Sequence, residues 1–235
     1  MNQDEIVSLP VASAVEKFIE NQTKDPEKMR GDLSALKLVP HFFSSAECEF
    51  FRKLVRKDST ERVQQLLNRK RLIFESEKVA EWFWNRLKEH NPFQTVRDEH
   101  GDYWKAVGIN PRFRLVRYDE GDSFQTHQDG FYWQDWNRKT FATAMVYLNS
   151  MEEEDGGVTR FHDICTVVKP AQGLLVVFCV NDLIHCGERC KKEKYLLRTD
   201  IFYELIIPRF TCCSFEEEFN IKRKQLWDEY QKMCN

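Results

Sequence analysis

The spacing of hydrophobic residues changes character about halfway along the chain. Before residue 103, two stretches repeat apolar residues every three or four positions, as amphipathic helices do. They run from Ala46 to Lys57 and from Ser76 to Glu89. Ser44 and Ser45 stand where they can cap the first helix, and Glu47 falls in its first turn. The sequence therefore predicts two helices ahead of the region that follows.

From residue 103 onward, short runs with period two, or with continuous apolar character, alternate with turn residues. These runs are Pro111–Tyr118, Thr140–Leu148, Val158–Phe161, Cys165–Val168, Leu174–Val180 and Tyr195–Ile207, and an earlier strand is predicted at Leu36–Phe43. Seven or eight short strands in about 105 residues indicate a β-sandwich or barrel. We therefore predict an α+β fold with a mainly β core.

The two ends of the chain read differently from the middle. Residues 1–35 are mostly polar, with one short helix predicted at Val11–Glu20. A final helix is predicted at Phe215–Cys234, with Phe219, Leu226, Trp227 and Tyr230 on its apolar side. The length of 235 residues fits one domain with appendages. We place the domain at 36–208, an N-terminal extension at 1–35 and a C-terminal helical segment at 209–235.

Composition narrows the class of protein. The 35 basic and 38 acidic residues give a net charge of −3, so no basic field is present to attract nucleic acid. No apolar run approaches the roughly 18 residues of a membrane span, and the first residues do not resemble a signal peptide. Eight cysteines without such a signal are typical of reduced thiols. These observations favour an intracellular protein of the cytosol or nucleus that has no membrane partner.

The segment Phe124–Gly130 brings an imidazole and a carboxylate together. In a strand, residues two apart share a face, so His127 and Asp129 project to the same side. A third ligand must come from further along the chain, and His185 is the candidate. Two histidines and one carboxylate on one side of an octahedral metal form the facial triad of non-haem Fe(II) oxygenases. The alternative is a pair of surface residues beside a turn.

Arg198 is unusual because it interrupts the apolar run Tyr195–Tyr203. A buried guanidinium is costly unless an anion meets it. A ligand with a carboxylate at its far end would be such an anion. By period two, Arg198 shares its face with Asp200 and Phe202. The alternative is therefore that Asp200, within the chain, pairs with Arg198.

A series of motifs in fixed order supports a resemblance to a known family. Residues 38–208 resemble the prolyl 4-hydroxylase-like group of Fe(II)- and 2-oxoglutarate-dependent dioxygenases. The matching pieces are Arg117-Tyr118-Asp-Glu-Gly121, His127-x-Asp129, Met145-Val-Tyr147-Leu-Asn149, Gly156-Gly157-x-Thr159-x-Phe161, Val168-Lys-Pro170-x-x-Gly173, His185-x-Gly187, and Arg198 followed by an apolar strand. The ordered series is far more specific than any single element.

The resemblance implies a double-stranded β-helix, or jelly roll. It implies Fe(II) held by His127, Asp129 and His185, with 2-oxoglutarate and dioxygen in the remaining positions, and it leaves ascorbate open as a further cofactor. Arg198 would bind the far carboxylate of 2-oxoglutarate and Tyr147 would donate to it, whereas Tyr118 would line the pocket near the metal. For both tyrosines the alternative is ordinary strand packing.

The stretch 130–139 directly follows Asp129 and is rich in aromatic residues. It shows no strand periodicity, so we interpret it as a covering loop that closes over the substrate. Aromatic side chains at a rim suit recognition of a proline ring. The alternative is that Phe131, Tyr132, Trp133 and Trp136 pack the loop onto the barrel.

The predicted function is hydroxylation of a C–H bond, on a protein side chain such as proline, with succinate and CO2 as coproducts. The same residues would serve a small-molecule substrate. Nucleic-acid demethylation is disfavoured by the acidic charge and because no second arginine follows Arg198 on its face. A non-catalytic jelly-roll binding module is disfavoured because all three metal positions and the arginine are present.

Overall fold

The computed structural model describes most of the central part of the chain. The described residues are 35–55, 61–62, 70–90, 93–98, 102–180 and 182–206, with the single residues 13, 16, 221, 225, 228 and 232. The helices predicted at 11–20 and 215–234 lie outside the described residues, apart from those single positions. The division of the chain at residues 36 and 208 stays a prediction.

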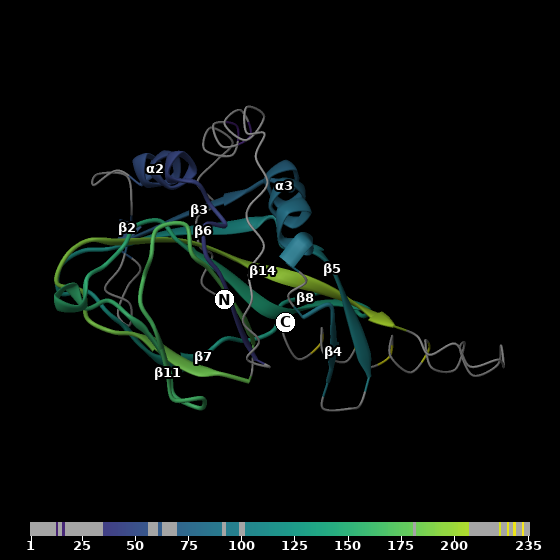
Figure 1. Cartoon of the computed structure of the whole chain (residues 1–235). Helices are drawn as coiled ribbons and strands as arrows, with labels where there is room; N and C mark the ends of the chain where they lie inside the picture. The colour runs from purple at the N-terminus through teal and green to yellow at the C-terminus, as the bar shows by residue number, and fades with distance from the viewer. Residues whose placement is uncertain are drawn as a thin grey trace.

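Two antiparallel β-sheets face each other, and together they form the jelly roll that the sequence predicted (Figure 1). The larger sheet contains β1 (Leu36–Val39), β2 (Glu61–Arg62), β3 (Lys70–Glu75), β4 (Thr95–Arg97), β5 (Tyr103–Ile109), β6 (Arg112–Tyr118), β8 (Trp133–Asp135), β9 (Arg138–Tyr147), β12 (Leu175–Cys179) and β14 (Lys194–Ile206). The smaller sheet contains β7 (Phe124–Gln128), β10 (Thr159–Phe161), β11 (Thr166–Val168) and β13 (Ile184–Gly187). The strands β2, β3 and β4 were not predicted.

The long strand β14 is central to the larger sheet. It pairs with β9 on one side and with β6, then β5, on the other. In the smaller sheet the order is β11-β10-β13-β7. This order makes β7 and β13 neighbours, although more than fifty residues separate them in the sequence. The fold thereby brings the two predicted histidine ligands onto adjacent strands.

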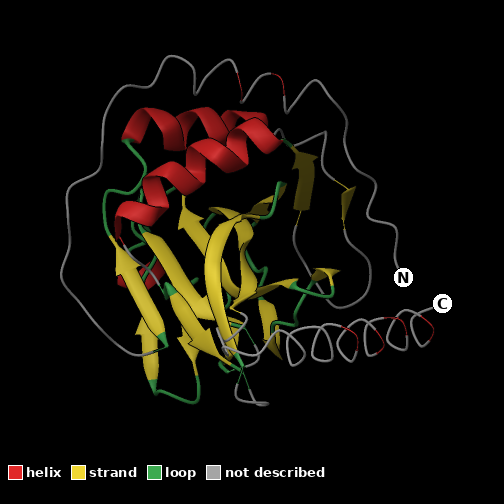
Figure 2. Ribbon diagram, turned by 90° about the vertical axis from the view of Figure 1, so that its right-hand side faces the viewer, coloured by secondary structure: helices red, strands yellow, loops and turns green. Residues whose placement is uncertain are grey.

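Two helices cover the outer face of the larger sheet, as Figure 2 shows. They are α2 (Ser45–Leu54) and α3 (Glu77–Leu87), and the short 3-10 helices are η1 (Lys88–His90) and η2 (Glu153–Asp155). The predicted cap of α2 is confirmed, because Ser44 Oγ accepts a hydrogen bond from the Glu47 backbone N–H while the Glu47 carboxylate accepts one from the Ser44 N–H. Ser76 caps α3 in the same way.

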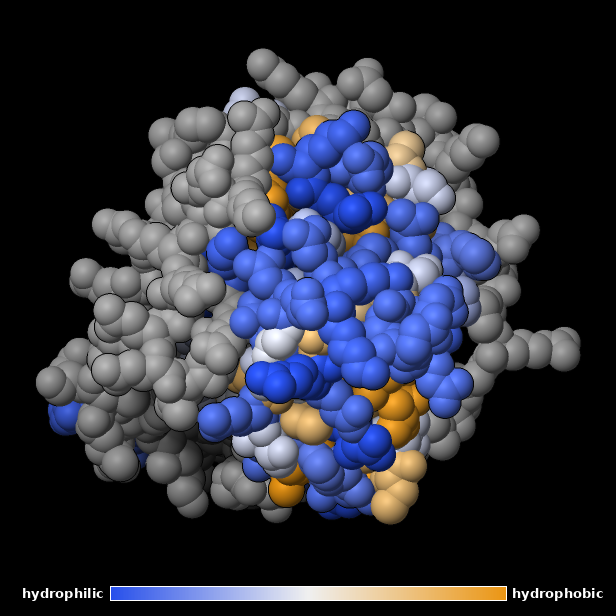
Figure 3. All heavy atoms as spheres, turned by 90° about the vertical axis from the view of Figure 1, so that its left-hand side faces the viewer, coloured by the Kyte–Doolittle hydropathy of each residue, from blue (hydrophilic) through white to orange (hydrophobic). Residues whose placement is uncertain are grey.

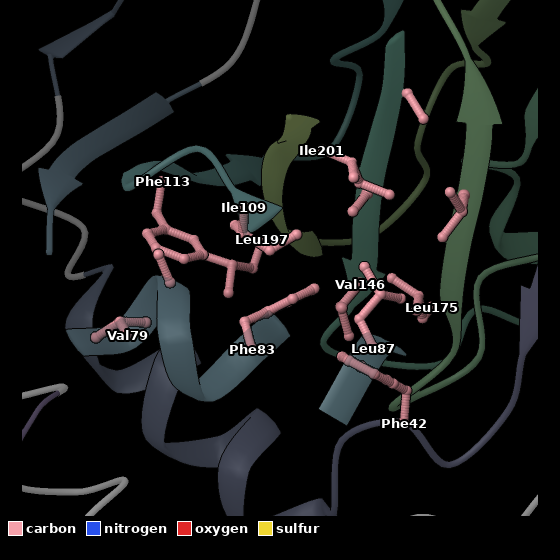
Figure 4. Close-up of a cluster of buried hydrophobic side chains, with 14 of the residues drawn as sticks. Phe42, Val79, Phe83, Leu87, Ile109, Phe113, Val146, Leu175, Leu197 and Ile201 are labelled. Carbon is pink, nitrogen blue, oxygen red and sulfur yellow. The ribbon is translucent and has the colours of Figure 1, made fainter. Parts of the chain in front are cut away.

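The larger hydrophobic core lies between these helices and the sheet. Phe83 and Leu87 of α3 meet Phe113, Val146 and Leu197 of the sheet, and all five are at most 1% exposed (Figure 4). A second cluster fills the space between the two sheets. Burial of large apolar side chains supplies most of the stabilisation, so the larger sheet is held between two cores, and the smaller sheet, which carries the two histidines, packs on the second of them.

The stretch 130–139 is not the irregular loop that we expected. Trp133–Asp135 forms β8, which pairs with the start of β9 in a hairpin. Phe131, Trp133 and Trp136 pack against the main core, whereas Tyr132 is 54% exposed. Three of the four aromatic residues therefore pack the segment onto the barrel, as the alternative stated. Only Tyr132 is exposed enough to meet a substrate, as the lid interpretation requires.

A buried lysine fixes this hairpin to the sheet. Lys139, at 5% exposure, lies in β9 with its Nζ over the rings of Trp104, Phe131, Trp133 and Phe141 at 4.6, 4.7, 4.3 and 4.4 Å. An ammonium over an aromatic face is attracted by the ring quadrupole, and more strongly when it is desolvated. The hairpin strand β8 is held mainly by this contact and by pairing with β9.

We expect Trp133→Ala to lower the free energy of unfolding by about 2 kcal/mol, because it removes buried ring area and one wall around Lys139. Urea denaturation measures the change. The matched control is Tyr132→Ala, which should change the free energy of unfolding by less than about 0.5 kcal/mol because that ring is exposed. Equal losses in the two variants would show that the hairpin is not held by packing.

The surface is strongly polar over the face that Figure 3 presents, where apolar side chains appear only in small patches. The mean hydropathy of the chain is −0.59. Among the described residues, no helix is long and apolar enough to cross a membrane.

Candidate metal and cosubstrate site

The three predicted metal ligands converge between the two sheets. His127 and His185 face each other across the antiparallel pair of β7 and β13, and Asp129 follows directly after β7. One ligand atom from each residue lies within 4.8 Å of the others. His127 Nε2 is 3.5 Å from one Asp129 carboxylate oxygen, and His185 Nε2 is 3.9 Å from the other.

The hydrogen bonds of the two imidazoles suit metal binding. His127 Nδ1 bonds to the Gln125 carbonyl oxygen at 2.8 Å, and His185 Nδ1 to the Leu183 carbonyl oxygen at 3.1 Å. An imidazole that donates its Nδ1–H to a carbonyl presents the lone pair of Nε2. His127 Nε2 is buried and has no hydrogen-bond partner among the described residues. Two such nitrogens beside a carboxylate form a donor set that fits Fe(II).

Aromatic rings fix the orientation of the imidazoles. The Phe124 ring lies 3.9 Å from that of His127, and the Phe178 ring meets His185 edge-on at 4.8 Å, centroid to centroid. The imidazoles therefore have little freedom to turn away from the point where their Nε2 atoms meet.

Asp129 is 6% exposed and is held from behind by two groups. Thr143 Oγ1 donates to Asp129 Oδ2 at 2.8 Å, and Arg198 Nη2 lies 2.9 Å from the same oxygen. The other oxygen, Oδ1, faces His127. Thr143 and Arg198 thus hold the Asp129 carboxylate in place beside the two imidazoles, where it would serve as the anionic ligand of a metal.

The charges around the ligands keep them in the forms that bind metal. Burial alone would raise the pKa of Asp129, but the Arg198 charge and the hydrogen bond from Thr143 hold it well below its ordinary value. Burial lowers the pKa of His185, although the Asp129 carboxylate acts in the opposite direction. Asp129 is therefore ionised and His185 neutral at pH 7.

We expect metal affinity to stay nearly constant from pH 8 to about 6.5, the ordinary imidazole pKa, and to fall at lower pH. Protons compete with the metal only where a ligand becomes protonated, and the lowered pKa of His185 moves that competition to lower pH. Titration with Mn(II) at several pH values measures the affinity. A tenfold loss between pH 8 and 7 would contradict the assignment of His185 as a neutral ligand.

The surroundings of Arg198 differ from our expectation. We expected a guanidinium that touches no metal ligand, and this is wrong because Arg198 lies 2.9 Å from Asp129. The pairing with Asp200 that we considered as the alternative is present at 3.5 Å. Asp200 makes its shorter contact with Arg114, at 2.9 Å. Arg198 thus belongs to a charged network behind the metal ligands, and its role as cosubstrate anchor stays a prediction.

A second buried cation lies deeper in the same cavity. Lys194, at the start of β14, is 1% exposed; its Nζ donates to the Gly157 carbonyl oxygen at 2.7 Å and lies 4.6 Å from the centre of the Tyr118 ring. Lys194 and Arg198 line one cavity together with His185, which we call the inner cavity. The inner cavity therefore has a metal-ligand end and a lysine end.

The two predicted tyrosines lie toward the lysine end. Tyr118 lines the inner cavity beside Lys194. Tyr147 is fully buried, and its hydroxyl lies 2.5 Å from Thr159 Oγ1. Thr159 is among the residues that line the cavity, whereas Tyr147 is not. The predicted contact of Tyr147 with the cosubstrate thus stays a prediction, and the hydroxyl of Thr159 is placed closer to the cavity.

The Gly156-Gly157 motif explains how the lysine end is built. Gly156 and Gly157 both have positive φ, at 66° and 69°. A Cβ on Gly156 would lie 2.5 Å from the Arg189 carbonyl oxygen, which no side chain could tolerate. This turn allows the chain to pass close to residue 189 and points the Gly157 carbonyl at Lys194.

Sequence reasoning missed Lys194, although a signal was available. Residues 194, 196 and 198 share one face of a strand. The rule that placed Arg198 inward therefore places Lys194 inward as well. We began the strand at Tyr195, because the apolar run starts there, and so left out the charged residue that precedes it.

Comparison with known proteins agrees with this geometry. Residues 113–199 match the model of the 2OG-Fe(II) oxygenase superfamily. No significant match was found among curated proteins.

Three similar solved structures show the same fold. A collagen prolyl hydroxylase of Paramecium bursaria Chlorella virus-1, in complex with 2-oxoglutarate, is 20% identical and has a TM-score of 0.53, with 72% of this chain and 96% of that chain covered. A prolyl-4-hydroxylase of Pseudomonas putida is 16% identical, with a TM-score of 0.53 and coverage of 71% and 91%. A prolyl hydroxylase of Trichoplax adhaerens, in complex with a hypoxia-inducible factor peptide, is 13% identical, with a TM-score of 0.56 and coverage of 82% and 89%.

The matched segment contains all three residues of the donor set as well as Arg114, Lys194 and Arg198 of the inner cavity. The double-stranded β-helix and the resemblance that the sequence indicated are confirmed. The chain therefore carries a segment, residues 113–199, that matches the 2OG-Fe(II) oxygenase superfamily, and the protein is a dioxygenase that uses Fe(II) and 2-oxoglutarate.

Proposed function

We propose that the protein hydroxylates a C–H bond on a protein side chain, such as proline, with His127, Asp129 and His185 as the Fe(II) ligands. Fe(II) with 2-oxoglutarate and dioxygen would supply the oxidising power, and succinate and CO2 would be the coproducts. The convergence of the three ligand atoms within 4.8 Å, beside a cavity that ends at a buried cation, carries the proposal.

The residues that line the inner cavity have two different roles, cosubstrate binding and support of the metal ligands. We infer that the distal carboxylate of 2-oxoglutarate binds at Lys194, with Thr159 as a hydroxyl partner and Tyr147 behind it. Lys194 stands four residues before Arg198 on β14 and lines the cavity with Thr159, whereas Arg198 is engaged by Asp129 and Asp200. A carboxylate desolvated at Lys194 would form a charge-assisted hydrogen bond, which is among the stronger protein–ligand contacts.

The apolar side chains around the site limit access of water. Met145, Leu196 and Phe178 line the inner cavity between its two ends. A reactive oxidant is used productively only when water is kept from it and substrate is close. These side chains give the walls of the cavity that property, while the charged residues at its edge leave an approach for the substrate.

The test is formation of succinate from 2-oxoglutarate by the Fe(II)-loaded protein in the presence of oxygen. We expect a low basal rate of succinate formation, and proline-containing peptides from a library should increase it. The modified peptide should gain 16 Da, the mass of one oxygen atom. His185→Ala should show neither basal nor stimulated succinate. Stimulation by small-molecule libraries alone would assign the same chemistry to a small substrate. Absence of succinate in every arm would contradict the proposal.

A further inference from the structure

A second, larger cavity adjoins the inner cavity, and Arg114 lines both. We call it the outer cavity; its lining includes Glu75, Glu77, Arg112, Arg114, Arg138 and Phe202. Its volume of about 380 Å³ lies in the range of ligand pockets. Because Arg114 lines both cavities, a molecule bound in the outer one would be separated from the inner cavity by a single side chain.

The outer cavity is lined by charged groups, and arginine dominates. Three arginines and two glutamates line it. Arg114 is held at its inner end by the buried Asp200, at 2.9 Å. Because Asp200 already holds Arg114, the lining arginines to consider for ligand binding are Arg112 and Arg138. A bare proline ring would leave this charged lining without a counterpart, so the substrate must offer polar groups of its own.

The ion pairs that these two arginines make with glutamates are long and exposed. Arg112 Nη1 lies 3.7 Å from Glu75, and Arg138 Nη1 lies 3.9 Å from Glu204, and both glutamates are more than 40% exposed. Ion pairs of this kind contribute little and rearrange easily. Arg138 Nε is buried without a hydrogen-bond partner among the described residues. Arg138 can therefore turn its guanidinium to a ligand at small cost.

An aromatic surface positions Arg138 for this role. Its guanidinium carbon lies 4.9 Å from the centre of the Phe202 ring, and Tyr132, exposed at the rim, is within 6.1 Å of the same ring. Stacking on an aromatic face keeps the planar fork of an arginine flat and leaves its edge available to a carboxylate. The carboxylates of Glu75 and Glu77 on the same lining would accept hydrogen bonds from the N–H groups of a peptide.

We propose that the outer cavity binds a peptide substrate that carries an acidic residue beside the residue to be hydroxylated, with Arg138 and Arg112 recognising its carboxylate. This inference rests on the proposed function and names its substrate class: an acidic peptide. Arg114 lines both cavities and is held by Asp200, so the carboxylate would bind at Arg138 and Arg112 while the neighbouring residue extends past Arg114 toward the inner cavity.

The experiment measures peptide binding without turnover. The full chain, loaded with Mn(II) and 2-oxoglutarate, is titrated with capped hexapeptides Ala-Ala-Pro-X-Ala-Ala in which X is Glu, Gln or Lys. We expect the Glu peptide to bind at least tenfold more tightly than the Gln peptide, and the preference to shrink as salt is raised. In Arg138→Gln the Glu and Gln peptides should bind alike, and Arg138→Glu should favour the Lys peptide.

The matched control is Arg160→Gln, which removes an arginine paired with Glu188 on the smaller sheet and should leave the preference intact. Equal binding of the Glu and Gln peptides by the parent protein, or no binding of the Glu peptide below 5 mM (roughly −3 kcal/mol), would overturn the proposal. If N-acetylglutamate binds as tightly as the Glu peptide, the ligand is a small acid and the peptide assignment is wrong. Succinate formation is measured separately, so loss of the proposed reaction and loss of the acidic preference are distinguishable.

Discussion

Replacing Lys194 with methionine is expected to weaken 2-oxoglutarate binding by about 30- to 4,000-fold. The side chain is 1% exposed and lines the inner cavity. A distal carboxylate without its cation there would be left unpaired in a poorly solvated pocket. Loss of one partner of such a pair costs roughly 2–5 kcal/mol, and each 1.4 kcal/mol is about tenfold in affinity. Methionine fills a similar volume, so the fold should survive.

The measurement compares 2-oxoglutarate affinity in the presence of Mn(II), which prevents turnover. Lys194→Arg is the conservative control and should restore part of the affinity, because it keeps the charge. Arg198→Ala tests the competing assignment. If Arg198→Ala loses more 2-oxoglutarate affinity than Lys194→Met while metal affinity is unchanged, Arg198 is the anchor, as we first predicted. Changes under threefold in both variants would mean that the carboxylate binds elsewhere.

His185→Ala is expected to abolish stoichiometric metal binding while the protein stays folded. The variant removes one of the three candidate ligands, His127, Asp129 and His185. Among the described residues, no other histidine is placed to replace it. The fold should tolerate the change because the hydrophobic clusters on both faces of the larger sheet remain. Bound iron per chain after desalting gives the result, with circular dichroism as the control for folding. An unchanged iron content would refute the metal assignment.

Thr143→Val separates ligand identity from ligand orientation. It removes the hydroxyl that donates to Asp129 Oδ2 but leaves all three ligands in place. Loss of such a supporting hydrogen bond typically weakens metal binding about 10- to 100-fold. A loss in this range with retained stoichiometry would show that Thr143 positions the carboxylate. An effect as complete as that of His185→Ala would instead indicate that the site has collapsed.

The sequence by itself determined most of the catalytic centre. His127 and Asp129 are two residues apart on one strand, so a local rule was enough to bring them together. The helices at 45–54 and 77–87 followed from apolar spacing and serine caps. His185 was already the candidate third ligand, and the ordered series of motifs then supported it across that distance in the sequence. These features depend on spacing along the chain, and spacing is what a sequence records.

The tertiary structure decided which charges meet. Asp200 meets Arg114 because β14 pairs with β6, and Arg198 reaches Asp129 because the two sheets face each other. Period two gave the face of Arg198 but could not name its partner on a neighbouring strand. In the same way, Lys139 ordered the aromatic stretch into a hairpin by placing its ammonium among rings from three strands and the adjoining turn. Such contacts depend on strand order and register, which are fixed by packing of the whole sheet and not by any local pattern.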